Sequence, residues 1–246
     1  MPIATDFKSI YSEKHIVNFP QCLPSGYLKY TELCNILQLT AASHAEKGGI
    51  SFSDMQAFDQ AWVLSRMRIE ITKMPRWQDE ITVTTWIISL ENSRSIRALE
   101  VDCNGEKIIG CETFWAVFNT VKRRPEPLSL PDSHFEKYAD KFSTIERVSK
   151  VALPDKIELV QNHIVVLSDL DIVNHVNNVK YLEWCLDCEN PQMILDSKVK
   201  SFDMNFMREL TYADEVDIMT EHTDNQSFYS LEKDQKSCFS LRINYK

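Results

Sequence analysis

Apolar and polar positions along the chain predict the same order of elements twice. In the first half, apolar residues recur with helical spacing over residues 30–44. Four segments rich in β-branched residues follow, and they predict strands at 62–73, 80–90, 96–103 and 107–119. The last two strands flank Asn104-Gly105, a dipeptide that favours a tight turn, so we expect them to form a hairpin.

The second half begins with a predicted strand at 157–167 and continues through a polar loop into a second helical pattern. This pattern runs from Val176 to Met193, with Pro191 near its end. Further strands are predicted at 199–209, 215–221, 228–233 and 237–245. Residues 79–85 also resemble residues 214–220, at a constant offset of 135 positions (214 minus 79). We infer that the two halves arose by duplication of one unit.

The segment between the halves, residues 122–131, contains three prolines, which supply no backbone donor and resist helix formation. We therefore expect an N-terminal domain over residues 1–121, a linker over 122–150 and a C-terminal domain over 151–246. A helix with an apolar stripe needs a covering partner. Each half is thus predicted to be an α+β unit in which a curved antiparallel sheet covers one helix.

The densest polar chemistry lies in residues 168–178, directly before the second predicted helix. This segment holds two carboxylates, one imidazole and three carboxamides in eleven residues. Such side chains compete with regular backbone hydrogen bonds, which predicts a loop that enters a helix. The first N–H groups of that helix, near Val176 to Asn178, could stabilise an oxyanion. The alternative is a turn and helix cap without chemistry.

Composition limits the cellular compartments and the binding partners that are expected for this chain. The net charge of −9 disfavours nonspecific binding to nucleic acid, because phosphate attraction needs a basic face. No window of about 18 residues is apolar and uncharged, and the first residues lack the features of a signal peptide. We therefore expect a cytoplasmic protein without a membrane span, whose seven cysteines are reduced thiols. Cys185 and Cys188 form an isolated C-x-x-C pair, so neither a metal nor another cofactor is expected.

Several segments together resemble the acyl-[acyl carrier protein] thioesterases of plants and bacteria. The resemblance rests on residues 169–181 (DLDIVNHVNNVKY) with Glu183-Trp184, on 62–71 (WVLSRMRIEI) with 75–79 and 85–86, and on 206–209 (FMRE). It spans about residues 5–245, almost the whole chain. It implies a tandem, or double, hotdog fold, with two antiparallel sheets each wrapped around a long helix. It also implies hydrolysis of the thioester that joins a fatty acyl chain to acyl carrier protein.

The resemblance implies a catalytic set of Asp171, Asn174, His175 and Glu209. Glu209 is expected to be the general base, partly desolvated on an apolar strand, or alternatively to form a salt bridge at the strand end. His175 would transfer a proton, or only cap the helix, and Asp171 would orient the loop. The family has asparagine at the position of Val173, and we expect the next residue, Asn174, to supply the carboxamide.

Attack by water is favoured over a cysteine nucleophile. Leu210 stands where the family often has cysteine. Cys185 and Cys188 lie a few turns into the predicted helix, away from the N-terminal position that activates a thiol.

The first half is expected to hold the acyl tail, because its helix start carries neither carboxylate nor imidazole. Candidate substrate-binding residues, which could also be core residues, are Trp62, Met67, Ile69, Trp86, Asn177 and Asn178. The acidic carrier protein would need basic residues at the mouth of the site, although such residues are often only solvated. The candidates are Lys122, Arg123, Arg124, Lys180 and Arg208.

Two other functions stay open from the sequence. The chain could hydrolyse acyl-coenzyme A instead of the acyl carrier, or it could bind acyl thioesters without catalysis. Exposed sheet edges in this fold can pair between chains, which allows a homodimer.

Overall fold

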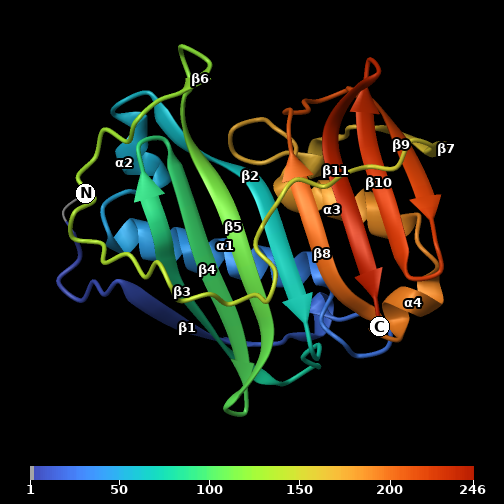
Figure 1. The fold of residues 1–246 in the computed structure, drawn as a ribbon, viewed down its shortest axis with the longest axis horizontal. Helices are drawn as coiled ribbons and strands as arrows, with labels where there is room; N and C mark the ends of the chain where they lie inside the picture. The colour runs from blue at the N-terminus through green and yellow to red at the C-terminus, as the bar shows by residue number, and fades with distance from the viewer. Residues whose placement is uncertain (1–2) are drawn as a thin grey trace.

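The computed structural model describes residues 3–246, and its first half follows the predicted order (Figure 1). Helix α1 (Tyr30–Lys47) contains the predicted apolar stripe. The four predicted strands are β2 (Gln60–Ile71), β3 (Glu80–Glu91), β4 (Arg94–Cys103) and β5 (Glu106–Asn119). Asn104 and Gly105 have φ of 55° and 79°, as a tight turn between β4 and β5 requires. Four short elements were not predicted: β1 (Ile10–Ile16), the 3-10 helix η1 (Phe19–Gln21), α2 (Phe52–Gln56) and β6 (Arg124–Pro125).

The second half contains two short helices where the sequence predicts one. Helix α3 (Asn178–Asp187) ends early, and α4 (Pro191–Leu195) begins at the proline that was expected near the helix end. Proline cannot donate inside a helix but fits its first turn, and the Asn190 side chain caps α4 by accepting from the Gln192 N–H. The strands are β7 (Glu158–Ile164), β8 (Val199–Phe206), β9 (Glu215–His222), β10 (Gln226–Lys233) and β11 (Lys236–Tyr245).

The strands of the described residues form one 11-stranded antiparallel sheet with the order β1-β3-β4-β5-β2-β8-β11-β10-β9-β7, and β6 pairs with β5. From its outer edge to the centre, the first half reads β1-β3-β4-β5-β2 and the second half reads β7-β9-β10-β11-β8. The order is the same in both, and the halves meet where β2 pairs with β8. At the middle of this seam Arg68 lies opposite Asp203. These residues are 135 positions apart, as in the repeated sequence run, so a local twofold axis relates the halves. The topology agrees with the predicted duplication.

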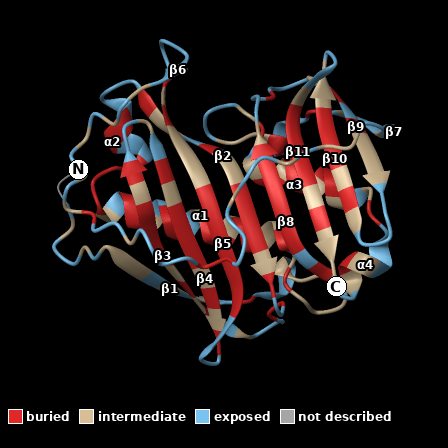
Figure 2. Cartoon of the chain, in the orientation of Figure 1, coloured by how far each residue is buried: buried red, intermediate tan, exposed pale blue. Residues whose placement is uncertain are grey.

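The helices cover one face of the sheet, and the connection between the halves crosses the other face (Figure 1). The central strands and the facing helices carry many of the buried residues (Figure 2), and the buried apolar residues of both form one core cluster. Tyr30 of α1 packs edge-on against Phe202 of β8, with ring centroids 5.1 Å apart, so this core continues from one half into the other. No helix among residues 3–246 is both long enough and apolar enough to cross a membrane.

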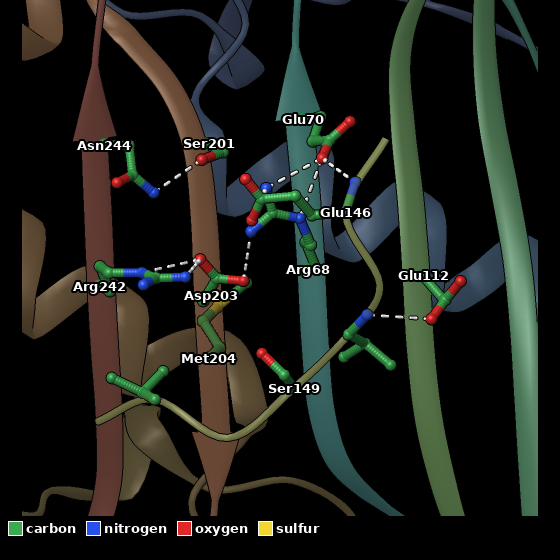
Figure 3. A network of polar contacts seen from close by, with 12 residues as sticks. Arg68, Glu70, Glu112, Glu146, Ser149, Ser201, Asp203, Met204, Arg242 and Asn244 are labelled. Carbon is green, nitrogen blue, oxygen red and sulfur yellow. Dashed lines mark hydrogen bonds and ion pairs between the residues drawn. The ribbon is translucent and has the colours of Figure 1, made fainter. Parts of the chain in front are cut away.

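A buried ion-pair network holds the seam together (Figure 3). Asp203, whose side chain is 2% exposed, lies between two arginines: its Oδ1 is 2.6 Å from Arg68 Nη1, and its Oδ2 is 2.8 Å from Arg242 Nη2. Glu70 Oε1 lies 2.9 Å from Arg68 Nη2. Burial alone would lower the pKa of Arg68, but the hydrogen bond and charge of Asp203 raise it overall, so the guanidinium stays charged.

Residues 143–151, called here the strap, cross the outer face of the sheet over both halves. Four backbone N–H groups of the strap donate to side chains on three strands: those of Ile145 and Glu146 to Glu70, Val148 to Glu112 and Val151 to Asn205. The strap also passes so close to Gly110 that a Cβ atom there would lie 1.9 Å from the Ser143 carbonyl oxygen. Only glycine fits under this crossing.

Removal of the Asp203 charge should destabilise the protein strongly. Asp203→Asn leaves two arginines without their shared buried partner, and the expected loss in free energy of unfolding is about 3–5 kcal/mol. Urea denaturation measures this loss. Glu146→Gln is the matched control, because Glu146 also pairs with Arg68 but is 68% exposed, and its loss should stay below about 1 kcal/mol. Equal losses in the two variants would show that burial of the pair is unimportant.

His44 should make stability depend on pH. This fully buried side chain lies 2.7 Å from Arg97 Nη1 through Nδ1 and 2.9 Å from the Lys8 carbonyl through Nε2. Burial and the Arg97 charge lower the pKa of His44 to about 3. The folded state therefore binds fewer protons than the unfolded state between pH 6.5 and about 3, so its stability should fall as the pH falls through that range.

The wild type should lose roughly 2 kcal/mol more than His44→Gln when urea unfolding is compared at pH 7 and pH 5. Glutamine can keep both hydrogen bonds but does not titrate. An identical pH dependence in both proteins would contradict the assignment.

Candidate active site

The two central strands separate at one end of the seam and open a cavity there. Pairing between β2 and β8 runs from Glu70 with Ser201 to Arg66 with Asn205. A register shift between Leu64 and Arg66 then bends β2 relative to β5. Beyond this point the two strands line a cavity of about 980 Å³ whose walls come from both halves.

The polar loop before α3 forms one wall of the cavity and is held in shape by Asp171. Its Oδ1 accepts the backbone N–H groups of Val173 (3.0 Å) and His175 (3.2 Å). The Asp171 N–H donates to the His175 carbonyl at 2.8 Å, which closes the turn. Asn174 lies at its tip with a φ of 64°. The backbone of His175 is thereby held in the turn, and this residue lines the cavity.

The first half contains the same backbone turn, but without the carboxylate and the imidazole. There Leu23 donates to the Tyr27 carbonyl at 2.8 Å, and Gly26 has a φ of 80°. By these hydrogen bonds Asn174 occupies the position of Gly26 and His175 that of Tyr27. Asparagine tolerates the left-handed conformation better than most residues, which explains its place in the turn. Asn174 is exposed and does not line the cavity, so the geometry gives no support to its predicted catalytic role.

Glu209 lies beyond the end of β8, so the prediction that it belongs to this strand was wrong. Pairing with β11 ends at Phe206, opposite Phe239. The next segment is anchored by the Met207 N–H, which donates to the Cys238 carbonyl at 2.8 Å. The Leu210 carbonyl accepts from the Val176 N–H at 2.8 Å and ties this segment to the polar loop. The Glu209 side chain is 36% exposed and lies in this segment, not on the apolar strand that was expected to bury it.

Two groups, an imidazole and a guanidinium, converge on the Glu209 carboxylate. His175 Nε2 lies 3.5 Å from Glu209 Oε2, as the catalytic prediction requires. Arg123 Nη2 lies 2.6 Å from the same oxygen, and Arg123 Nη1 lies 3.4 Å from Oε1. The salt bridge considered as an alternative for Glu209 therefore exists, but its partner comes from the turn after β5 in the other half. Glu209 contacts a histidine and an arginine at the same time.

The other predicted substrate contacts divide into cavity and core residues. Trp62 and Asn178 line the cavity. Met67, Ile69 and Trp86 are 0–1% exposed and do not line it, so they are core residues. Asn177 is exposed and caps α3, where its Oδ1 accepts the Val179 N–H at 3.1 Å. Sequence alone cannot distinguish cavity residues from core residues, because an apolar residue on a strand can line a cavity or pack in the core.

Only two of the predicted basic residues line the cavity, Arg123 and Arg208. Lys122 pairs with Glu126, and Lys180 pairs with Glu183 at 3.0 Å. Arg124 is exposed in β6, outside the cavity.

Several cavity residues carried no signal in the sequence. Three come from the turn between β10 and β11, and two come from α2: Lys233, Asp234, Lys236, Phe52 and Gln56. Tyr181 and Cys238 also line the cavity. Burial raises the pKa of the Tyr181 phenol and of the Cys238 thiol, so both are neutral. The Tyr181 hydroxyl donates to the Arg208 carbonyl at 3.4 Å.

Comparison with known proteins identifies the family. The family model of the acyl-ACP thioesterase N-terminal domain matches residues 8–138, and that of the C-terminal domain matches residues 153–243. A palmitoyl-acyl carrier protein thioesterase of Arabidopsis thaliana is 30% identical over 189 residues, which cover 71% of this chain. An oleoyl-acyl carrier protein thioesterase of the same plant is 28% identical over 237 residues, or 85% of this chain. The chain spans 46% and 62% of the lengths of these two chloroplastic relatives.

Solved structures agree with the fold. An acyl-ACP thioesterase from Bacteroides thetaiotaomicron superimposes with a TM-score of 0.89 at 23% identity, over 97% of this chain and 98% of that one. The 12:0-ACP thioesterase from Umbellularia californica gives a TM-score of 0.82 at 20% identity, over the same shares of the two chains. These likenesses confirm the α+β double hotdog architecture, in which the sheets of the two halves join at β2 and β8. The chain belongs to the acyl-ACP thioesterase family.

Proposed function

We propose that this protein hydrolyses the thioester between a fatty acyl chain and an acyl carrier protein. The observation that carries this proposal is the meeting of His175 and Glu209, 3.5 Å apart, on the wall of a cavity large enough for an acyl chain. Membership of the acyl-ACP thioesterase family supports the reaction and the carrier. Relatives named for palmitoyl, oleoyl and dodecanoyl substrates support a fatty acyl group.

In the proposed mechanism Glu209 accepts a proton from a water molecule while the water oxygen bonds to the thioester carbonyl carbon. The tetrahedral oxyanion then collapses, the C–S bond breaks, and the sulfur takes the proton that Glu209 removed from water, which His175 relays to it. The products are a free fatty acid and the carrier thiol. Asp171 keeps the His175 backbone in place through its two accepted N–H groups and does not need to touch the substrate.

The start of α3 supplies the proposed oxyanion donor. The Val176 N–H donates to Leu210, and the Asn177 N–H donates to Asp169 at 2.9 Å, so both are already used. Within residues 3–246 the Asn178 N–H has no hydrogen-bond acceptor, and this residue lines the cavity. An N–H at the first position of a helix is also favoured by the helix dipole. We therefore assign the oxyanion to the Asn178 backbone.

The apolar part of the cavity is proposed to hold the acyl chain. Its walls carry Phe52, Trp62, Leu64, Phe118 and Phe206. Each buried methylene contributes on the order of 0.8 kcal/mol, so the depth of this space selects the chain length. Arg208 and Lys236, both exposed at the cavity, would face the acidic carrier. A cytoplasmic location and a homodimer remain predictions.

Glu209→Gln should lower kcat for acyl-carrier hydrolysis by about 10²- to 10⁴-fold, because the amide cannot accept the proton of water. Release of the carrier thiol measures this rate. Glu183→Gln is the matched control: this carboxylate on α3 pairs with Lys180 outside the cavity, and its loss should leave the rate unchanged. Full activity of Glu209→Gln would remove Glu209 from the mechanism. Binding of acyl thioester without thiol release in the wild type would favour the non-catalytic alternative.

The carrier is tested by giving the enzyme one acyl chain on two carriers. If the protein surface of the carrier contributes to binding, kcat/KM should be at least about tenfold higher for the acyl carrier protein than for coenzyme A. This preference should shrink as salt rises through about 0.1 M, where the Debye length is about 10 Å. Equal values that do not change with salt would favour the acyl-coenzyme A thioesterase alternative.

A further inference from the structure

Arg123 contacts Glu209 from a turn whose backbone is fixed by several hydrogen bonds. It lies in the turn between β5 and β6, where the Asn119 side chain accepts the N–H groups of Val121 (3.1 Å) and Lys122 (2.7 Å). Thr120 adds a backbone hydrogen bond of 2.8 Å to the Asp59 carbonyl. Arg123 itself has a φ of 54°, a conformation that non-glycine residues seldom adopt. The turn is therefore built to present this side chain in one direction.

The guanidinium holds Glu209 at two points. Its Nη2 and Nη1 lie 2.6 Å and 3.4 Å from Oε2 and Oε1, respectively, and its Cζ lies 5.4 Å from the centre of the Phe118 ring. A two-point contact with a planar guanidinium fixes the rotation of a carboxylate, which a single charge cannot do. Oε2, the oxygen that receives the shorter contact, is also the one that faces His175. The orientation imposed by Arg123 is thus the one that the proposed reaction needs.

We propose that Arg123 is a positioning residue of the hydrolytic reaction, contributed by the first half to the site in the second half, and not a carrier-docking residue. It keeps the Glu209 carboxylate turned toward His175 before the substrate arrives. The assignment corrects the role that the basic run 122–124 suggests from the sequence alone. It rests on the proposed hydrolysis.

The test compares Arg123→Ala with wild type on two substrates that carry the same acyl chain, the acyl carrier protein and a small acyl-pantetheine thioester. A positioning residue should lower kcat by about 10- to 100-fold on both substrates and change KM by less than about threefold. A docking residue would instead raise KM for the carrier substrate alone. Lysine should rescue kcat only in part, because it restores the charge without the planar fork.

Two further variants complete the experiment. In a Glu209→Gln background Arg123→Ala should cause no additional loss, because Arg123 acts through Glu209. Arg94→Ala removes an exposed arginine at the start of β4, outside the cavity, and should leave both rates and the melting temperature unchanged.

Each remaining outcome decides against one specific claim. A kcat for Arg123→Ala equal to or above the wild-type value, with Glu209→Gln inactive, would overturn the positioning role and leave the proposed function intact. Full activity in Glu209→Gln would instead overturn the proposed function. A lower melting temperature for Arg123→Ala than for Arg94→Ala, with a loss that persists in the Glu209→Gln background, would assign Arg123 a structural role only.

Discussion

The buried contact of Arg68 with Asp203 is the constraint on which the rest of the molecule depends. It lies at the centre of a seam of only five residue pairs that joins the two halves of the sheet. A buried ion pair is a weak source of stability but a strong source of specificity when its loss leaves a charge without a partner. Here it fixes the register of β2 against β8, and a shift of one residue would turn every seam side chain to the opposite face. Arg242, Glu70 and the strap satisfy the remaining polar groups, so the register is set from several directions.

The two ends of this seam are related by the internal symmetry of the sheet, and they differ in what fills them. At one end the bulge in β2 and the end of β8 open the cavity. At the other end the Lys246 side chain donates to the Thr72 carbonyl at 3.2 Å and to the Ser197 carbonyl at 3.4 Å, which bridges the two strands. The loops that precede the first helix of each half also differ in their side chains. Tyr27 and Met74 stand where the second half has His175 and Glu209, although the backbone hydrogen bonds of the two loops match. The backbone of the motif loop is thus common to both halves, and the proposed catalytic side chains occur in only one of them.

Local periodicity predicted most elements to within a few residues, because β-branched alternation and the Asn104-Gly105 turn are local signals. It missed α2, a short helix with a local cap at Ser51, and it merged α3 with α4 because the apolar spacing continues through Pro191. The approach of His175 to Glu209 was predictable only through resemblance to a family. The contact of Arg123 with Glu209 joins residues 86 positions apart, and no local pattern marks it. Met67 and Trp62 illustrate the same limit, since two residues of one strand divide between core and cavity according to tertiary packing alone.

The position of Glu209 changes the physical argument for its reactivity. Desolvation on an apolar strand would have strengthened it as a base, but the side chain is partly exposed and carries a guanidinium partner. In the proposed reaction the acyl substrate would displace water from this wall, and both contacts of the carboxylate would strengthen as the local dielectric falls. The fixed orientation of Glu209 would also remove the cost of aligning it with His175 and water. Reactivity at this site would then depend on preorganisation, which requires that both halves keep the register in which Arg68 lies opposite Asp203.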